Sequence, residues 1–412
     1  MKGGEGGGGA ANGGAARRGP GLRVASRLDV LHESATLAMS QLAADLRAQG
    51  RDVVSLAAGE PDFATPPHVQ DAARQAMTDG HTKYPPVAGI ATLRAAIAAE
   101  VGGYTGRAVD PAEVVVSAGG KHALFNLFQA LVEPGDEVVV IAPYWVSYPP
   151  QIMFAGGRAV IVETEMEDGW RLDPDRLREA ITPRTRALVL NAPSNPTGAA
   201  YTLEELEPIA EVALEHDLWI VSDDIYREIT FDGFAWRSIA AVAPEVARRT
   251  LVVSGTSKSY SMTGWRIGWA VAPPPLASAM ARLQSQVTSG ANSVAQHAAL
   301  AAVAGPRAAV AEMVAAFARR RAMVLGLLRE AGVACQPPRG AFYLFPDCGA
   351  ASEAAGGSLA LATRLMEEHG VATIPGEPFG AEGFLRLSFA ASEEALRKGV
   401  ARLIEGLKHI AR

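Results

Sequence analysis

The sequence predicts an α/β protein built on a mostly parallel sheet, and three features lead to this. Between about Pro111 and Pro273 one pattern repeats: a short apolar run, a turn, and a helical stretch. Most of the runs are near-continuous in Val, Ile and Leu, as strands buried on both faces are. Helical segments such as Leu203–His216 lie between several runs, as crossovers between parallel strands require. The runs are Val114–Ser117, Glu137–Ala142, Ala159–Glu163, Ala187–Asn191, Leu218–Ser222, Leu251–Ser254 and Ile267–Ala272.

The chain outside that block does not follow this repeating pattern, and it predicts a second, smaller α+β domain. Its 412 residues are enough for two domains. We expect a large domain at 60–305 and a small domain formed by 22–59 together with 306–412. The expected helices are Thr36–Ala48, Arg307–Ala331 and Glu393–Lys408, and the expected strands are Val371–Ile374 and Phe384–Ser388.

The first 21 residues, MKGGEGGGGAANGGAARRGPG, are glycine-rich and predict disorder. Such a segment buries too little apolar surface to offset the entropy of ordering it. It has no apolar core of the kind that marks a secretory signal. Its arginines leave a transit peptide open, although the lack of serine argues against one.

Composition narrows the class of partner and the compartment. The net charge of -6 gives no reason to expect nucleic acid or an anionic membrane. Cys335 and Cys348 lack metal-ligand spacing, so we interpret them as free thiols in a reducing compartment. No stretch has the roughly 20 uninterrupted apolar residues of a membrane span. We therefore expect a soluble cytoplasmic protein without a metal.

Glycines follow the first strand of the repeating block, in the stretch SAGGKHALFNLF. Gly119 and Gly120 let the backbone approach a ligand closely, and the helix that follows offers free N–H groups that suit a phosphate. The stretch is not a Walker loop, because His122 follows Lys121 where Ser or Thr is needed. A tight strand-to-helix turn is an alternative explanation of the two glycines.

Later strands of the block also end in polar residues, in NAPSNPTG, SDDIYRE and SGTSKSY. NAPSNPTG alone is typical of a loop. Asp223 and Asp224 are adjacent carboxylates at the end of a buried strand, where a positive partner is needed. The next strand is followed by Lys258. Ligands of open α/β sheets bind at the carboxyl ends of the strands, so a single site accounts for these groups together. Pyridoxal 5'-phosphate requires a phosphate cradle, an acid partner for its ring nitrogen, and a lysine.

The chain resembles the class I, fold-type-I aminotransferases, nearest to the bacterial aspartate aminotransferases. The motifs are AGEPDF, GGK, PYWVSYP, NPTG, D-x-I-Y and SK followed by MTGWRIG, and they run in the family's order. The likeness covers the chain from about Leu31 to its C-terminus. It implies the fold of a fold-type-I transferase that depends on pyridoxal phosphate, with a seven-stranded, mostly parallel sheet in the large domain.

The resemblance also implies the residues that hold the cofactor. Lys258 matches the lysine that forms the Schiff base and then moves the substrate's α-proton, and Asp223 matches the partner of the ring nitrogen. Asn195 and Tyr226 match donors to the phenolic oxygen. Trp145 matches the aromatic stacked on the ring, with a buried core tryptophan as the alternative, and Ile225 would pack on the opposite face.

For the phosphate, the resemblance points to the backbone of Gly120 and Lys121 and to the guanidinium of Arg266. Many relatives place a serine three positions before the lysine, but Gly255 stands there in this chain. Ser254, Thr256 or Ser257 would then substitute, and we assign Ser257. Asp224 also departs from relatives, which often carry glutamate, and we expect it to lie outside the ring contact.

Substrate residues follow from the same likeness. Arg386 in FLRLSFA would bind the α-carboxylate, with Asn195, Trp145 and the backbone of Gly59. TSGANS lacks the arginine with which one branch of the family binds a side-chain carboxylate. The branch that this chain resembles uses the lysine of GGK, so Lys121 would serve, with Ser34 and Thr36 beside it. An exposed helix lysine is the alternative for Lys121.

The implied reaction is ping-pong transfer of the amino group from aspartate to 2-oxoglutarate in a homodimer with shared sites. Tyr84 would reach the neighbouring subunit's phosphate, and the partner would lend Thr288–Asn292. One alternative is a prephenate, aromatic, alanine or kynurenine aminotransferase, or a lyase, on the same cofactor. Another is a regulatory binding module, but the residues before Leu31 are too few and too glycine-rich for its DNA-binding helix-turn-helix.

Overall fold

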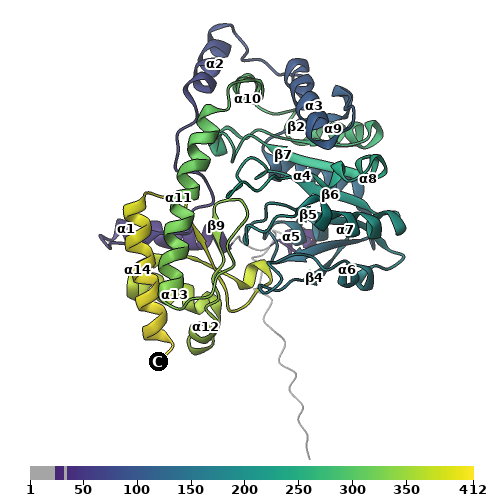
Figure 1. Cartoon of the computed structure of the whole chain (residues 1–412). Helices are drawn as coiled ribbons and strands as arrows, with labels where there is room; N and C mark the ends of the chain where they lie inside the picture. The colour runs from purple at the N-terminus through teal and green to yellow at the C-terminus, as the bar shows by residue number, and fades with distance from the viewer. Residues whose placement is uncertain (1–23, 32–34) are drawn as a thin grey trace, which may run out of the picture.

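The computed structural model describes residues 24–31 and 35–412, without the side chains of 35–37. Within these ranges a large sheet flanked by helices lies beside a second group of helices and short strands (Figure 1). The glycine-rich start and Ser34 lie outside the described residues, so the prediction of disorder for 1–21 stays a prediction.

Seven strands form the large sheet in the described part of the chain. Their order is β2-β8-β7-β6-β5-β3-β4. Strand β8 runs antiparallel to both of its neighbours, whereas the other pairs are parallel. This confirms the predicted α/β fold with a mostly parallel sheet. The strands are β2 (Val114–Ser117), β3 (Glu137–Ala142), β4 (Arg158–Glu163), β5 (Thr185–Asn191), β6 (Trp219–Asp223), β7 (Thr250–Gly255) and β8 (Gly268–Val271).

Helices cover both faces of this sheet (Figure 1). One face carries α4 (Gly120–Leu131), α5 (Tyr148–Phe154) and α9 (Pro274–Val287). The other carries α3 (Ala91–Thr105), α6 (Pro174–Ala180), α7 (Leu203–Glu215), α8 (Pro244–Arg249) and α10 (Ser293–Ala304). In β3, Val138 and Val140 point to one face of the sheet and pack against helices α4, α5 and α9. Val139 points to the other face and packs against helices α6, α7 and α8. Burial on both faces explains why the strands read as near-continuous apolar runs.

The second group of elements joins the start of the described chain to its C-terminal part. Strand β1 pairs in parallel with β10, with Val54 opposite Val371, and β11, β12 and β9 form an antiparallel sheet. The predicted strand Val371–Ile374 is two strands, because its halves pair in different sheets. The strands are β1 (Val54–Ser55), β9 (Tyr343–Leu344), β10 (Val371–Ala372), β11 (Ile374–Pro375) and β12 (Leu385–Ser388). The division into domains at 60–305 stays a prediction.

Helix α11 is the longest in the described ranges and runs from beside α10 to the second group (Figure 1). It comprises Ala308–Glu330, close to the predicted Arg307–Ala331. The other helices are α1 (Ala35–Ala48), α2 (Pro67–Thr78), α12 (Gly349–Ala355), α13 (Ser358–His369) and α14 (Glu393–Ile410). Short 3-10 helices are η1 (Ser26–Leu28), η2 (Pro111–Glu113), η3 (Ile239–Ala241), η4 (Thr263–Trp265) and η5 (Glu377–Phe379).

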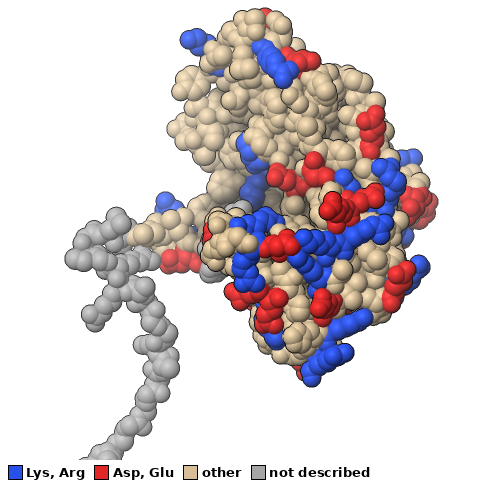
Figure 2. All heavy atoms as spheres, turned by 90° about the vertical axis from the view of Figure 1, so that its left-hand side faces the viewer, with Lys and Arg blue, Asp and Glu red and all other residues tan. Residues whose placement is uncertain are grey.

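Charges of both signs are interspersed on the face that includes α14 (Figure 2). Asp52, for example, pairs with Lys398 at 2.7 Å and with Arg402 at 2.6 Å. Taken singly, no helix within 24–31 and 35–412 has the length and apolar composition of a membrane span. Helices α10 and α11 meet that test only as a pair, across a bend of 77°.

Candidate active site

A cavity of about 530 Å³ lies at the carboxyl ends of β5, β6 and β7, and also reaches β12 and the loop after β1. It brings together most of the residues that the sequence nominates. The predicted residues that line it are Gly59, Gly120, Lys121, Trp145, Asn195, Asp223, Ile225, Tyr226, Ser257, Lys258, Arg266 and Arg386.

Lys258 follows β7 and extends into this cavity. Its Nζ donates a hydrogen bond to the carbonyl oxygen of Gly59 at 2.5 Å. Burial, helped by the positive charge of Arg386, lowers the pKa of the Lys258 amine to about 8. A neutral amine is a nucleophile and a base, so this environment keeps Lys258 usable near neutral pH.

Asp223 is the last residue of β6, and its carboxylate is buried. Tyr148 Oη donates to Asp223 Oδ2 at 2.7 Å, and the backbone N–H of Ile225 donates to Oδ1 at 3.3 Å. Burial nevertheless raises the pKa of Asp223 to about 6. The carboxylate is therefore short of positive charge and suited to a cationic N–H group. The neighbouring Asp224 does not line the cavity and accepts from Ser222 Oγ at 2.6 Å.

Arg386 on β12 brings a buried guanidinium to the same cavity. Its Nη1 donates to Asn195 Oδ1 at 3.0 Å and its Nη2 donates to Ala57 O at 3.1 Å. Its Nε has no hydrogen-bond partner among the described residues. Burial lowers the pKa of Arg386. A buried guanidinium with a donor to spare suits a carboxylate, to which it can bind in a bidentate manner.

The amino end of α4 and Arg266 form one wall of the cavity. Gly119 precedes the helix with φ 89°, and a Cβ atom at this position would collide with the guanidinium of Arg266. Arg266 donates to Ala118 O at 3.3 Å and to Thr263 O at 2.9 Å. Free N–H groups, the helix dipole and a guanidinium together favour a phosphate. The buried Ser257 adds a hydroxyl group.

Lys121 and Trp145 stand together at the cavity wall. Lys121 Nζ lies 5.0 Å from the centroid of the Trp145 ring, within the range of a cation–π contact. Burial and the nearby Arg266 lower the pKa of Lys121. The side chain lines the cavity and is also exposed to solvent, so its role in binding substrate stays a prediction.

Some predicted residues are not placed in the cavity. Tyr84 is 90% exposed and, like the segment Thr288–Asn292, does not line it. Ser34 lies outside the described residues, and nothing of the Thr36 side chain is described. The roles assigned to these residues stay predictions.

Tyr148, Tyr343 and Glu60 are among the cavity residues that the sequence did not nominate. Tyr148 stands inside the PYWVSYP motif, but a tyrosine in such a motif is also typical of a core. Tyr343 lies 3.0 Å from Tyr226, oxygen to oxygen, and no motif marks it. Glu60 lines the cavity and accepts from Thr263 Oγ1 at 2.5 Å, and its place in AGEPDF was the available signal.

The groups in this cavity fit pyridoxal 5'-phosphate. Lys258 offers an amine, and the Gly119 turn with Arg266 offers a phosphate cradle. Asp223 offers a buried carboxylate that has no cationic hydrogen-bond partner within the described part of the chain. The guanidinium of Arg386 lines the same cavity and suits a carboxylate of the substrate of such a cofactor. Fold and site together define a pyridoxal-phosphate-dependent transferase of fold type I.

Comparison with known proteins gives the family. The model of the family described as aminotransferase class I and II matches residues 51–403. The chain therefore belongs to the aminotransferase class I and II family, whose members use pyridoxal phosphate.

Individual relatives are similar over nearly their whole length. The aspartate aminotransferase of Geobacillus stearothermophilus is 46% identical, over 93% of this chain and 98% of its own. The aspartate/prephenate aminotransferase of Thermus thermophilus is 48% identical, over 92% and 97% respectively. A solved structure of the aspartate aminotransferase from Thermus thermophilus with maleate superposes with a TM-score of 0.89. It is 47% identical and covers 93% of this chain and 100% of that chain.

Proposed function

We propose that this aminotransferase moves the amino group of aspartate to 2-oxoglutarate and releases oxaloacetate and glutamate. The observation that carries the proposal is the meeting of Lys258, Arg386 and Lys121 around one cavity. These side chains supply one group for the chemistry and two positive charges for the two carboxylates of the substrate. Relatives named aspartate aminotransferase support this assignment.

Pyridoxal phosphate, when bound, supplies an aldehyde for covalent attachment and a ring that accepts electrons. Arg266, Ser257 and the backbone N–H groups of Gly120 and Lys121 hold its phosphate. Asp223 accepts the N–H of the ring and keeps that nitrogen protonated. Asn195 and Tyr226 donate to the phenolic oxygen. Trp145 and Ile225 enclose the ring between them.

Lys258 would hold the cofactor through its Nζ atom and would also serve as acid and base toward the substrate. Because the pKa of Lys258 is lowered to about 8, a useful share of the amine is neutral near neutral pH. Its Nζ can then take the α-proton of the substrate. The same nitrogen then returns the proton. The two half-reactions use one site in turn, which is the basis of ping-pong kinetics.

Arg386 binds the α-carboxylate, with Asn195 and the backbone of Gly59 beside it, and Trp145 bounds the substrate's space. Lys121 binds the side-chain carboxylate, with Ser34 and Thr36 as further contacts. A lysine ammonium is a point charge that suits carboxylates on chains of different length. In support, the solved Thermus relative carries maleate, a dicarboxylate. Prephenate is the second candidate substrate, because another relative is named aspartate/prephenate aminotransferase.

We also infer a homodimer in which Tyr84 contacts the neighbouring phosphate. Ser293 Oγ donates to His81 O at 2.7 Å, so the segment with Tyr84 lies beside the one that contains Thr288–Asn292. The 90% exposed Tyr84 ring is free to enter a neighbouring subunit. The free thiols Cys335 and Cys348 support a reducing, cytoplasmic location.

Donor specificity tests the proposal. Purified enzyme with pyridoxal phosphate is assayed with aspartate, glutamate, alanine and phenylalanine as amino donors and 2-oxoglutarate or oxaloacetate as acceptor. We expect aspartate to have the highest kcat/KM. Lys121→Met should lower kcat/KM for aspartate by about 10- to 100-fold, since a charged hydrogen bond contributes about 1.5–3 kcal/mol. It should leave the value for alanine within about threefold.

Lys258→Ala is the control for the shared chemistry and should remove activity with every donor. Equal losses for aspartate and alanine in Lys121→Met would contradict the role of Lys121. A parent enzyme that prefers alanine or phenylalanine would establish the alternative aminotransferase instead.

A further inference from the structure

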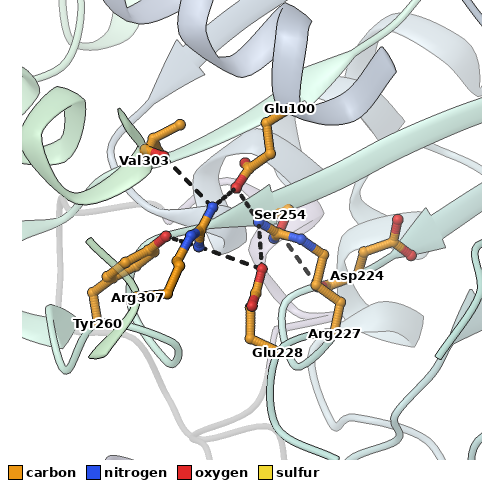
Figure 3. Close-up of polar contacts among 8 residues, drawn as sticks. All are labelled: Glu100, Asp224, Arg227, Glu228, Ser254, Tyr260, Val303 and Arg307. Carbon is orange, nitrogen blue, oxygen red and sulfur yellow. Dashed lines mark hydrogen bonds and ion pairs between the residues drawn. The ribbon is translucent and has the colours of Figure 1, made fainter. Parts of the chain in front are cut away.

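A cluster of charged residues around the buried Arg227 lies near the candidate site, and none of its members lines the cavity. The arginine cluster consists of Glu100, Arg227, Glu228 and Arg307 (Figure 3). Glu100 stands on α3, Arg227 and Glu228 on the loop after β6, and Arg307 immediately before α11. The side chain of Arg227 is only 4% exposed. Buried charges are costly to desolvate, so such a group calls for an explanation beyond stability.

Arg227 joins the loop after β6 to the neighbouring strand β7. Its Nη1 donates to Ser254 Oγ at 2.9 Å, and its Nη2 lies 2.6 Å from Glu100 Oε1. Ser254 Oγ in turn donates to the backbone oxygen of Asp224 at 3.3 Å. One side chain thus ties the loop to β7 through Ser254 and to α3 through Glu100. A guanidinium can make both at once, whereas an ammonium acts as a single point charge.

Arg307 extends the cluster to the start of α11. Its Nη2 lies 2.8 Å from Glu100 Oε1, the oxygen that also contacts Arg227 (Figure 3). Its Nη1 contacts Tyr260 Oη and lies 3.4 Å from Glu228 Oε1. Tyr260 follows Lys258 by two residues in the chain, as Glu228 follows Tyr226. The cluster therefore holds both segments that carry the chemical groups.

We propose that Arg227 is a positioning residue, and that the cluster fixes the spacing between Asp223 and Lys258. Asp223 ends β6 and Lys258 follows β7, so the two groups approach the cofactor from adjacent strands. This inference rests on the roles proposed above for these two residues. One cofactor must reach both groups, and a displacement of about 1 Å can cost about 100-fold in rate. Arg307 belongs to the same set of contacts, because it shares Glu100 with Arg227.

Arg386 offers a way to separate positioning from other effects. It binds from β12 and contacts Asn195 and Ala57, none of which the cluster touches. Loss of the contacts within the arginine cluster should therefore lower kcat and weaken cofactor binding, while KM for aspartate stays nearly unchanged. A cluster that only stabilises the fold would change the unfolding temperature and leave kcat of the folded enzyme as it was.

The test compares three variants with the parent at 25 °C. Ser254→Ala removes the link between β7 and the loop that carries Arg227, without altering any charge. Arg227→Lys keeps a charge for Glu100 but cannot make both contacts. Glu100→Gln with Arg227→Met removes both buried charges together, so no unpaired charge remains to unfold the protein. Measured quantities are kcat, KM for aspartate, the dissociation constant of pyridoxal phosphate, and the unfolding temperature without cofactor.

We expect kcat to fall about tenfold in all three variants, with KM for aspartate within about twofold. The dissociation constant of the cofactor should rise severalfold in all three. In the double variant the unfolding temperature should lie near that of the parent, while kcat stays low. A kcat within twofold of the parent in Ser254→Ala and in the double variant would overturn the proposal, whatever the change in stability.

A matched control is Arg184→Met, which takes an arginine from the buried Glu137 at the amino end of β3. It should lower the unfolding temperature and leave kcat and cofactor affinity unchanged. Failure of the proposed function is recognised separately. A parent that does not transaminate aspartate refutes that function, while cofactor affinity in the variants still reports on the cluster.

Discussion

Two buried carboxylates on the large sheet have opposite electrostatic surroundings. Glu137 is the first residue of β3, and it accepts hydrogen bonds from Arg158 at 2.7 Å, Arg184 at 2.7 Å and Thr182 at 2.7 Å. These donors hold the pKa of Glu137 well below its ordinary value, at about 2. Asp223 is the last residue of β6, where burial raises the pKa to about 6.

The difference shows how one sheet separates stability from chemistry. At the amino end of β3 the carboxylate is fully matched with cations, and nothing remains for a ligand. At the carboxyl end of β6 the only side-chain donor to Asp223 is the neutral Tyr148 among the described residues. Ligands of open α/β sheets bind at the carboxyl ends of the strands. A carboxylate without a cationic partner at that position, such as Asp223, favours the binding of a cationic group of the ligand.

Asp223→Asn should give the largest effect. We expect kcat to fall by about 10²–10³-fold, since a preorganised charge facing the cofactor is lost. The cofactor-free protein should gain up to about 3 kcal/mol at pH 8, at about 1.36 kcal/mol per pKa unit. The raised pKa penalises the folded state above about pH 6, and the penalty disappears as the pH falls to the ordinary value of 3.8. Urea unfolding at pH 8 and pH 4.5 measures this, and a variant less stable than the parent at pH 8 would refute the argument.

Glu137→Gln should have an intermediate effect of the opposite kind. It should cost about 1–2 kcal/mol in the free energy of unfolding, because the two arginines are largely exposed and water screens them. Activity should not change. The lowered pKa means that the contribution is complete above the ordinary value of 4.5 and is lost as the pH falls toward about 2. Urea unfolding at pH 7 and pH 3 should show the gap between variant and parent closing in acid. A lowered kcat would break the comparison.

Tyr148→Phe should give the smallest effect and sharpen the contrast. Loss of the 2.7 Å hydrogen bond should raise the pKa of Asp223 further above about 6. One hydrogen bond contributes about 0.5–1.5 kcal/mol, so kcat should fall about two- to tenfold. Only the ionised carboxylate pairs with the ring, so cofactor affinity should start to weaken at a higher pH than in the parent. Titration of the cofactor-free protein with pyridoxal phosphate between pH 5 and 8 tests this, and superimposable curves would exclude the role of Tyr148.

The sequence predicts the fold and much of the cavity for a physical reason. Buried strands leave a strong apolar pattern, and the groups at their carboxyl ends, such as Asp223 and Lys258, must converge on one edge. Arg386 lies on another sheet, and only the family resemblance places it in the site. Tyr84 is assigned from the same resemblance, and its role depends on a second copy of the chain.

The missed residues act through contacts that no local pattern encodes. Tyr148 reads as a core aromatic until the fold brings it to Asp223, 75 positions away. Glu100 lies on α3 and Arg307 immediately before α11, and no motif marks either residue. Glu100 pairs with both the buried Arg227 and Arg307, and these contacts depend on how α3 and the start of α11 pack against the loop after β6.

The contacts of Arg386 have a consequence for biosynthesis. Its guanidinium bonds to Ala57 near the start of the chain and to Asn195 in the middle, and it is itself translated late. Every residue assigned to the cofactor within one subunit precedes it, ending with Arg266. The ribosome needs roughly ten seconds to pass from Arg266 to Arg386 at usual elongation rates. During that interval a nascent chain can carry the residues that contact the cofactor but lacks Arg386, which binds the substrate's carboxylate. Turnover therefore requires the synthesis of β12.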